Sequence, residues 1–386
     1  MAQPPLGVGM VGYAFMGAAH SQAWRTARHA FALPRRPVLA VLCGRDEAAA
    51  RSAAERYGFS SVVTDWRALL DRDDVQLIDV CTPGNSHAEI SIAALDAGKH
   101  VLCEKPMANT VAEAEAMAAA AERARARGIR AMVGFNYRRV PAIALARQLV
   151  AAGRIGTIRH VRASYLQDWL ADPAFPLTWR LRREQAGSGA LGDLGSHIAD
   201  LAQHLTGQLI TGVSAASAIF INERQLAAGQ EPGRTGAVTV DDAVTFSARL
   251  GPGTLATFEA TRFAAGRKNA LRIELNGERG SLAFDLERLN ELEFYDRGED
   301  PATAGFRRVL VTEPGHPYLS AWWPPGHVLG WEHTFVHEVR DLLAAIAAGA
   351  DPAPSFADGL QVQRVLAAVA DSAAKDSQWT PVAAGH

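Results

Sequence analysis

The first third of the chain alternates short apolar segments with segments of helical periodicity, and this alternation constrains the fold more than any other feature. Apolar strands are predicted at residues 6–11, 38–43, 61–63, 75–81, 100–103 and 129–135. Helices are predicted between them at 18–28, 46–57, 66–70, 88–97 and 111–127. Strands that alternate with helices pair in parallel, with right-handed crossovers. The sequence therefore predicts an α/β fold that begins with a doubly wound parallel sheet.

The pattern changes after about Tyr137. A helix at 142–151, a strand at 157–167, several strand-like segments between 211 and 295, and helices near 331–348 and 357–374 follow. Gly-Pro-Gly at 251–253 and Asn-Gly at 276–277 are hairpin signals. These features predict an α+β second domain with a large, mostly antiparallel sheet. We therefore expect two domains, at 1–136 and 137–386.

Size and composition limit the class of protein. The chain of 386 residues is longer than an ordinary domain with a single hydrophobic core. A net charge of −2 and 48% apolar residues are typical of a globular protein. The balanced charge gives no sign of a nucleic-acid or anionic-membrane partner, and no apolar run approaches the roughly 20 residues that span a bilayer. Residues 1–5 lack the basic and apolar regions of a signal peptide. Three cysteines, an odd and sparse set, favour a reducing cytoplasm over disulfides or a metal site.

A glycine-containing turn follows the first predicted strand. Gly12-Tyr13-Ala14-Phe15-Met16-Gly17 stands between a strand and a helix, which is the context that a dinucleotide-binding fingerprint requires. Gly12 permits a tight turn, Gly17 lets the helix pack close to the strand, and the free N–H groups at the helix start face a pyrophosphate. Ala14 replaces the middle glycine of the pattern. Taken alone, the turn also fits a glycine-rich connection that binds no ligand.

Glu104-Lys105-Pro106 follows the strand predicted at 100–103. A strand that stops on a Lys and then a Pro places that Lys at the carboxyl edge of the sheet, where open α/β sheets bind ligands. A partly desolvated Lys loses its proton more easily than in water, so it can work as an acid or base near neutral pH. The alternative is a surface Lys followed by a proline that begins a helix.

A second glycine-rich stretch, at 186–200, opens a predicted helix. Asp193 and His197 are four residues apart and share one face of that helix. An imidazole can exchange a proton with a hydroxyl, and a carboxylate beside it can orient that hydroxyl. The alternative is an Asp favoured by the helix dipole beside a structural histidine. Glycines at 187, 189, 192 and 195 favour function, because they suggest that something approaches the backbone closely.

Four motifs, in this order and spacing, resemble the glucose–fructose oxidoreductase/inositol dehydrogenase family. They are the turn at 12–17 with His20, the turn Thr82-Pro83-Gly84-Asn85 with His87, Glu104-Lys105-Pro106, and Asp193 with His197. The stretches 172–207, 316–318 and 322–327 further resemble its levoglucosan dehydrogenase-like subgroup. The resemblance covers nearly the whole chain. It implies a Rossmann domain, then a substrate-binding domain whose open sheet often mediates oligomers, here a homodimer or homotetramer.

The resemblance implies the catalytic residues, and together with the motifs it predicts the other site residues. The residues expected to be catalytic are Lys105, Asp193 and His197. The residues expected to bind the cofactor are Gly12, Tyr13, Ala14, Phe15, Met16, Gly17, Cys43, Gly44, Arg45, Thr82, Pro83, Asn85, His87, Glu104 and Lys105. The residues expected to bind the substrate are Lys105, Tyr137, Gln167, Trp179, Arg180, Asp193 and His197. No metal is expected, because these groups manage the charge that develops at oxygen.

One departure from the family pattern leaves the cofactor as NAD or NADP. NAD-preferring relatives often carry an Asp for the ribose hydroxyls where this chain has Cys43, and Cys43-Gly44-Arg45 supplies no carboxylate. Arg45 is a cation that a 2′-phosphate can meet. We therefore expect NADP to be accepted.

Several other residues have two interpretations. They border the active site, or they are solvated linker residues: these are the two interpretations of Tyr137, Arg138 and Arg139. A second group of residues either contacts a polar substrate ring or is buried in a core: Gln167, Asp168, Trp169, Trp179 and Arg180. The order of the His and Glu residues near the C-terminus differs from that of a zinc protease motif. We therefore expect structural roles, and not metal binding, for His333, His337 and Glu338.

These inferences predict a cytoplasmic, nicotinamide-dependent oxidoreductase that acts on a secondary alcohol of a sugar, anhydrosugar or inositol. His197 would take the hydroxyl proton, directly or in relay with Lys105, Lys105 would stabilise the alkoxide, and Asp193 would orient the hydroxyl. Two alternatives stay open: an NAD-dependent glycosidase that oxidises the sugar transiently, and a cofactor-binding regulator without catalysis. Self-association is expected through the second sheet, because the segments at 243–275 carry more apolar residues than one solvated face requires.

Overall fold

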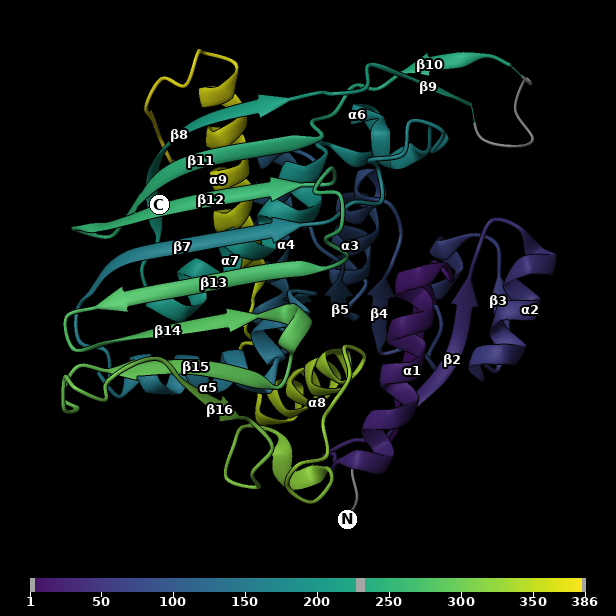
Figure 1. Cartoon of the computed structure of the whole chain (residues 1–386). Coiled ribbons are helices and arrows are strands. Elements are labelled where there is room, and N and C mark those ends of the chain that lie inside the picture. Colours follow the sequence, from purple (N-terminus) through teal and green to yellow (C-terminus); the bar gives the residue numbers. More distant parts are fainter. Residues whose placement is uncertain (1–3, 227–232, 384–386) are drawn as a thin grey trace. The chain divides into compact units, whose positions relative to one another are not determined.

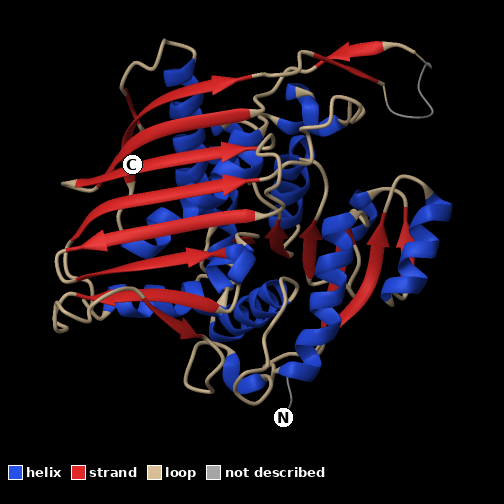
Figure 2. Cartoon of the chain, viewed as in Figure 1, coloured by secondary structure: helices blue, strands red, loops and turns tan. Residues whose placement is uncertain are grey.

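The computed structural model describes residues 4–226 and 233–383. The chain divides into two compact units, whose elements are traced in Figures 1 and 2. One unit holds Met1–Arg139 with Gly330–Leu360, and the other holds Val140–Leu329 with Gln361–His386. The first division lies close to the boundary expected at 136/137, but residues 330–360 belong to the first unit. Of residues 1–5, which lack the regions of a signal peptide, residues 1–3 lie outside the described residues.

A six-stranded parallel sheet forms the centre of the first unit (Figure 1). Its strand order is β3-β2-β1-β4-β5-β6. The strands are β1 (Leu6–Val11), β2 (Pro37–Cys43), β3 (Ser61–Val63), β4 (Leu77–Val80), β5 (His100–Cys103) and β6 (Ala131–Val133). The predicted doubly wound parallel sheet is confirmed. Its order reverses between β1 and β4, and open α/β sheets bind ligands beyond the carboxyl ends of the strands at such a point.

Helices connect these strands, and some of them begin at a side-chain cap. They are α1 (Phe15–Ala30), α2 (Glu47–Tyr57), α3 (His87–Asp96) and α4 (Val111–Arg125), with the short turns η1 (Trp66–Leu69), η2 (Gly84–Ser86) and η3 (Asn136–Arg139). Asp46 accepts from the N–H of Ala49 at the start of α2. Thr110 and Glu113 form a capping box at the start of α4. Helices α1 and α3 differ, since their N-caps make no side-chain hydrogen bond.

Buried contacts attach residues 330–360 to the first unit. This stretch holds α8 (His333–Ala348), which packs against α1 and η3, and the start of α9 (Phe356–Ala373). Asn136 Nδ2 donates to Thr334 Oγ1 (2.8 Å), and the Arg138 guanidinium lies 3.4 Å from the Asp358 carboxylate. All of η3 is buried. The interpretation of residues 137–139 as solvated linker is therefore wrong, because these side chains hold the returning segment.

The second unit is built on a nine-stranded sheet (Figure 2). Its order is β16-β15-β14-β13-β7-β12-β11-β8-β17, and only β7 and β12 pair in parallel. The strands are β7 (Ile158–Leu166), β8 (Ile210–Ala218), β11 (Ala243–Leu250), β12 (Thr254–Thr261), β13 (Ala270–Gly277), β14 (Gly280–Asp285), β15 (Glu291–Asp296), β16 (Arg307–Leu310) and β17 (Thr380–Pro381). A separate ribbon joins β9 (Glu223–Gln225) and β10 (Thr235–Ala237). The predicted mostly antiparallel sheet is confirmed.

The two faces of this sheet differ in polarity. Helices α5 (Pro141–Ala151) and α7 (Ser196–Thr206) contact strands β7, β13, β14 and β15. Along β11, Val244 and Phe246 are buried while Thr245 is exposed. The same alternation continues in β12, where Leu255 is the one large apolar side chain exposed among the described residues of the strand. The expectation of surplus apolar residues on the outer face is therefore wrong, because the large apolar side chains of β11 and β12, apart from Leu255, face inward.

The described helices also bear on membrane association. None of them, in the ranges 4–226 and 233–383, is both long and apolar enough to cross a membrane.

Candidate functional site

Two glycines shape the turn after β1. Gly12 has a φ of +102°, and a Cβ there would lie 2.7 Å from the carbonyl oxygen of Cys81. A Cβ on Gly17 would lie 2.2 Å from the carbonyl oxygen of Gly12. Only glycine fits either position without a shift of the backbone. The predicted tight turn and close helix approach are confirmed, and contact with a cofactor stays a prediction.

Helix α1 begins at this turn with its first backbone N–H groups uncapped. Ala14 occupies the N-cap without a side-chain hydrogen bond, and the first turn holds no acidic residue. The positive end of the helix therefore suits an anion such as the pyrophosphate of a dinucleotide. Met16 is half-buried, and Phe15 is 64% exposed at the surface of the turn. The residues present thus fit the cofactor that the glycine pattern predicts.

Trp331 links two of the predicted site residues. It stacks on Phe15 with ring centroids 5.5 Å apart, and its Nε1 donates to Tyr137 Oη (3.3 Å). Tyr137 is 4% exposed, so most of its ring packs inside the unit. Trp331 was not predicted as a site residue, because no local pattern shows that residues 330–360 return to the first unit.

The end of β2 is where the adenosine ribose of a dinucleotide is expected. Cys43 is buried, and burial together with the nearby Asp65 carboxylate raises the pKa of its thiol to about 11. The ring of Tyr13 packs onto Gly44, where a Cβ would lie 2.1 Å from Tyr13 Cε1. Arg45 is exposed. The predicted cation is therefore present, and the carboxylate of Asp65, which was not expected at this site, lies just beyond β3.

His87 ties the loop after β4 to the loop after β5. Its Nε2 lies 2.8 Å from the carbonyl oxygen of Thr82, and its Nδ1 lies 3.0 Å from that of Pro106. Burial lowers the pKa of His87, and the two carbonyl groups oppose that shift. Since His87 is 2% exposed and both ring nitrogens face the main chain, it supports the loop. In that loop Pro83 is half-buried and Asn85 is exposed.

Lys105 lies just beyond β5 at the carboxyl edge of the sheet, as predicted. Its side chain is half-buried, and its backbone N–H donates to Glu104 Oε2 (3.1 Å). Glu104 is only 4% exposed, and its Oε1 lies 2.9 Å from His20 Nε2. The two neighbours therefore differ: Lys105 retains access to solvent, while Glu104 is a buried support.

In the second unit, Asp193 lies in one turn of π-helix, η5 (Leu191–Gly195), which leads into α7. An ordinary α-helix was expected. Asp241 fixes the turn, because its carboxylate accepts from the N–H groups of Gly189 (2.8 Å) and Leu191 (2.7 Å). A Cβ on Gly189 would lie 1.7 Å from the carbonyl oxygen of Asp241. At Gly189, the close approach that the glycines suggested is thus made by the chain's own backbone. Such π-turns are frequent at functional sites.

Arg262, which was not predicted as a site residue, holds Asp193. Its Nη2 donates to Asp193 Oδ2 (3.0 Å), and its guanidinium lies over the ring of Trp169, 5.2 Å from the centroid. The side chain of Arg262 is 2% exposed, whereas that of Asp193 is 32% exposed. One carboxylate oxygen of Asp193 therefore binds a buried cation, and the exposed part of the group can meet a hydroxyl.

His197 lies in the first turn of α7 and is 5% exposed. The ring of Tyr165 meets it edge-on, with centroids 5.8 Å apart. Tyr165 Oη donates to Asn269 Oδ1 (2.6 Å), which also accepts from Gln167 Nε2 (2.8 Å). Gln167 therefore belongs to a hydrogen-bonded group beside His197. Tyr165 and Asn269 were missed, because a Tyr in a strand and an Asn before one form no motif.

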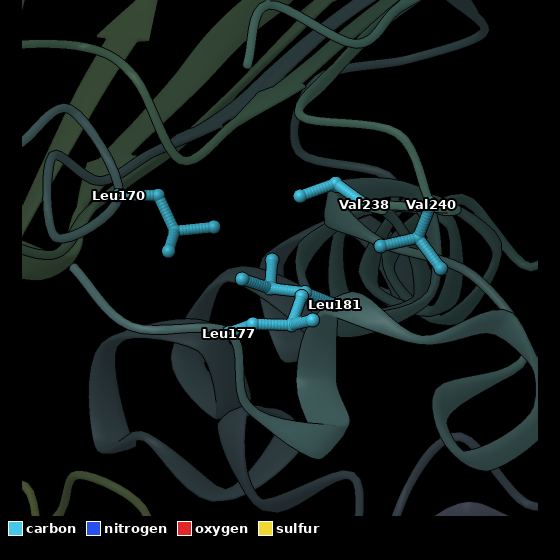
Figure 3. Close-up of a cluster of buried hydrophobic side chains, with 5 residues drawn as sticks. All are labelled: Leu170, Leu177, Leu181, Val238 and Val240. Atoms are coloured by element: carbon cyan, nitrogen blue, oxygen red, sulfur yellow. The ribbon is translucent and has the colours of Figure 1, made fainter. Parts of the chain in front are cut away.

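The loop that carries the next two predicted residues, Trp179 and Arg180, rests on a small separate core (Figure 3). Its members are at most 6% exposed: Leu170, Leu177, Leu181, Val238 and Val240. Arg224 of β9 fastens the same loop, since its guanidinium donates to three carbonyl oxygens. They are those of Leu170 (2.6 Å), Asp172 (2.8 Å) and Phe175 (3.1 Å). The loop is thus held by apolar contacts and by a buried cation.

Trp179 and Arg180 form a cation–π pair, with the guanidinium 4.4 Å from the ring centroid. Burial lowers the pKa of Arg180, and the Asp193 carboxylate opposes that shift. Both side chains are half-buried, so either can contact a ligand. Asp168 differs, because its carboxylate already binds Lys268 Nζ at 2.7 Å.

The histidines of α8 have structural partners. His337 is fully buried with Nδ1 3.0 Å from the carbonyl oxygen of Arg139, and burial lowers its pKa to about 3. His333 Nδ1 lies 3.4 Å from Glu332. Burial raises the pKa of Glu338 to about 8. These contacts agree with the structural roles expected for the three residues.

Comparison with known proteins covers both units. A family model described as "Oxidoreductase family, NAD-binding Rossmann fold" matches residues 6–135, and one described as "GFO/IDH/MocA C-terminal domain" matches residues 143–283. The chain is 42% identical to levoglucosan dehydrogenase from Pseudarthrobacter phenanthrenivorans, over 98% of each chain.

Two solved structures are similar over the same length. An oxidoreductase domain protein from Kribbella flavida is 65% identical with a TM-score of 0.96, over 99% of this chain and 100% of that chain. Levoglucosan dehydrogenase in complex with NADH and levoglucosan is 42% identical with a TM-score of 0.93, over 99% and 100%.

Proposed function

The chain belongs to the GFO/IDH/MocA family of oxidoreductases with an NAD-binding Rossmann fold, and from this membership we propose that it is an NAD-dependent dehydrogenase of anhydrosugars. It would oxidise a secondary alcohol on a ring such as that of levoglucosan to the ketone. The observation that carries this choice of substrate is the 42% identity to a levoglucosan dehydrogenase over 98% of the chain. The Asp193 carboxylate, held by a buried arginine and partly exposed, supports it.

In this proposal three residues divide the work at one substrate hydroxyl. Asp193, oriented by Arg262, accepts a hydrogen bond from the substrate hydroxyl and thereby orients that hydroxyl. His197 takes the hydroxyl proton as the C–H bond breaks, directly or in relay with Lys105. Lys105 stabilises the alkoxide that develops. A bound nicotinamide supplies the acceptor for the hydride.

Residues of the first unit would hold the cofactor. The uncapped N–H groups at the start of α1 would bind its pyrophosphate, and Gly12 and Gly17 keep the turn compact enough to present them. The stretch 43–45 would meet the adenosine ribose. The loop at 82–85 follows β4, beside the point where the strand order reverses, and would border the nicotinamide half.

Net formation of NADH from NAD and levoglucosan tests the proposal. We expect NADH with levoglucosan, and less with glucose or myo-inositol. Net NADH separates this activity from a glycosidase, which returns the hydride to the sugar, and from a regulator, which forms none. A protein that binds NAD but forms no NADH with any anhydrosugar, sugar or inositol would contradict the proposal.

A lysine pair gives the matched control. Lys105→Met should lower kcat by about 100-fold or more with little change in NAD binding, as for loss of a proton-transfer or alkoxide-stabilising group. Lys375 is 59% exposed and lies 4.0 Å from Asp371, so Lys375→Met should leave kcat unchanged. Normal turnover of Lys105→Met would remove Lys105 from the mechanism.

We also propose self-association, as a homodimer or homotetramer, through the outer face of the nine-stranded sheet. That face carries opposite charges side by side, as in Arg162 with Glu274 (3.1 Å) and Arg272 with Asp285 (2.8 Å). Such a surface suits a polar contact between copies. A cytoplasmic location stays a prediction.

A further inference from the structure

We infer that His20 is a charged positioning residue, an imidazolium that fixes Lys105 through Glu104. This role rests on the proposed function, because that proposal gives Lys105 its catalytic part. His20 comes from α1, Asp79 from β4, and Glu104 from the end of β5. Their exposed fractions are 1%, 0% and 4%. Three ionisable side chains are therefore buried together in the first unit.

His20 uses both of its ring nitrogens. Its Nδ1 lies 3.0 and 3.1 Å from the two oxygens of Asp79, and its Nε2 lies 2.9 Å from Glu104 Oε1. A neutral imidazole has one N–H group, so it would leave a lone pair facing a carboxylate oxygen. Two hydrogen bonds to the ring therefore need two protons within the triad of His20, Asp79 and Glu104.

The remaining contacts favour the arrangement with both protons on the ring. Trp24 Nε1 donates to Asp79 Oδ2 (2.7 Å), and the N–H of Lys105 donates to Glu104 Oε2 (3.1 Å). Asp79 Oδ2 and Glu104 Oε2 thus accept hydrogen bonds from donors outside the ring, which favours two ionised carboxylates and leaves the ring as the donor to the other two oxygens. His20 is then the cation, and the triad carries a net charge of −1.

Other ionisable groups face the triad from the elements packed around α1. Cys81 Sγ lies 3.5 Å from Asp79 Oδ1, and Arg139 Nη1 lies 3.8 Å from Glu338 Oε1. Burial raises the pKa values of the Cys81 thiol and, to about 8, of Glu338, so both are mainly neutral at pH 7. Burial alone lowers the pKa of His20, but Asp79 raises it well above its usual value. The surroundings therefore agree with a charged ring.

Glu104 transmits the position of this cation to Lys105. One carboxylate oxygen meets His20 and the other meets the N–H of Lys105, so a rotation of the carboxylate would break both contacts. A Cβ on Gly134 would lie 3.2 Å from Glu104 Oε1, so the neighbouring strand end packs closely as well. A displacement of about 1 Å at a catalytic group can lower the rate about 100-fold, so loss of the His20 cation should slow the reaction.

Nitrogen NMR of the protein labelled at histidine tests the charge. Loss of signals in His20→Gln assigns the ring. We expect both ring nitrogens of His20 to be protonated at about pH 7, above the usual pKa of histidine. His100 is the internal reference, because burial lowers its pKa to about 4 and its Nδ1 accepts from the N–H of Arg130 (2.9 Å). An unprotonated ring nitrogen on His20 at pH 7 would overturn the proposal.

Carbon NMR of the methylated lysines tests the link to Lys105. The chain has four lysines, and Lys105→Met assigns the signal that matters. His20→Gln and Glu104→Gln should each move the Lys105 signal and leave the other three in place. His100→Gln is the matched control, since it removes a buried histidine from the opposite end of β5. A Lys105 signal that is unchanged in both variants, or that moves equally in His100→Gln, would overturn the proposal.

Kinetics with levoglucosan give the third measurement. His20→Gln should lower kcat by about 100-fold while the Kd for NAD changes by less than about threefold, and His100→Gln should keep its kcat. Wild-type kcat in His20→Gln would exclude the positioning role. If the unmodified protein oxidises no substrate, the proposed function fails, while the two NMR measurements still decide the charge of His20 and its link to Lys105.

Discussion

Two buried cations, Arg262 and His20, each hold a carboxylate that belongs to, or lies next to, a residue that we expect to act on the substrate. Arg262 contacts Asp193 directly, and His20 contacts Glu104, whose neighbour is Lys105. Hydrogen bonds and charges that are oriented before binding need no reorganisation at the moment of reaction. At the residue scale, the orientation of these carboxylates is therefore part of the folded protein before a substrate arrives.

Arg262→Met should lower kcat by about 10- to 100-fold, because one partner of a buried, hydrogen-bonded charge pair is lost. Asp193→Asn and the double variant should show losses of similar size, since all three remove the same pair. Arg159, 64% exposed on the same unit, offers Arg159→Met as a control that should keep kcat. Additive losses in the double variant would show that Arg262 does not act through Asp193.

Arg45 and Asp65 have opposite expected effects on the choice of cofactor. Arg45→Ala should weaken NADP selectively by about one to two orders of magnitude, as for a lost charge-assisted phosphate contact. Asp65→Asn should strengthen NADP, because the 2′-phosphate then meets less negative charge. Titration of NAD and NADP into each variant measures both effects. Equal changes in the affinities for NAD and NADP would show that neither side chain interacts with the 2′-phosphate.

At the scale of elements, sequence patterns succeeded where neighbouring residues decide the structure. Both sheets, most helices and the edge position of Lys105 followed from periodicity and turn chemistry. The π-turn at 191–195 did not, because the carboxylate of Asp241 that shapes it lies far along the chain. Arg262 and Trp331 were missed for the same reason: each becomes a site residue only through a partner distant in sequence.

Helix α8 should give the stability of the protein a measurable pH dependence. Burial raises the pKa of Glu338 from 4.5 to about 8, so the folded chain keeps a proton that the unfolded chain releases. This stabilisation is complete below about pH 4.5 and is lost as the pH rises through about 8, with a slope of at most about 1.4 kcal/mol per pH unit. Glu338→Gln should flatten the pH dependence of the unfolding free energy across that window, as measured by chemical denaturation.

Glu332 provides the comparison for this measurement. It precedes α8 and is 43% exposed, so Glu332→Gln should keep the slope of the unmodified protein. A slope that persists in Glu338→Gln would assign the pH dependence to another group.

At the scale of the whole molecule, the outer face of the nine-stranded sheet is the surface expected to meet a second copy. Light scattering at micromolar concentration should report a homodimer or homotetramer. Because the face is charged, association should weaken as salt rises, and Arg162→Glu should weaken it further. Arg340, 47% exposed on α8 in the other unit, offers Arg340→Glu as the control. A monomer at low salt would contradict the proposal.

The chain passes from one unit to the other three times, after Arg139, Leu329 and Leu360. Synthesis runs from the N-terminus, so strands β1–β6 leave the ribosome long before α8, the helix that packs against α1. Strands β7–β16 all emerge in the interval between them, so most of the second sheet is available to pair while α1 still lacks its neighbour. The unit that begins first in synthesis is thus completed late, and α1 acquires its buried partners only after nearly the whole chain has been made.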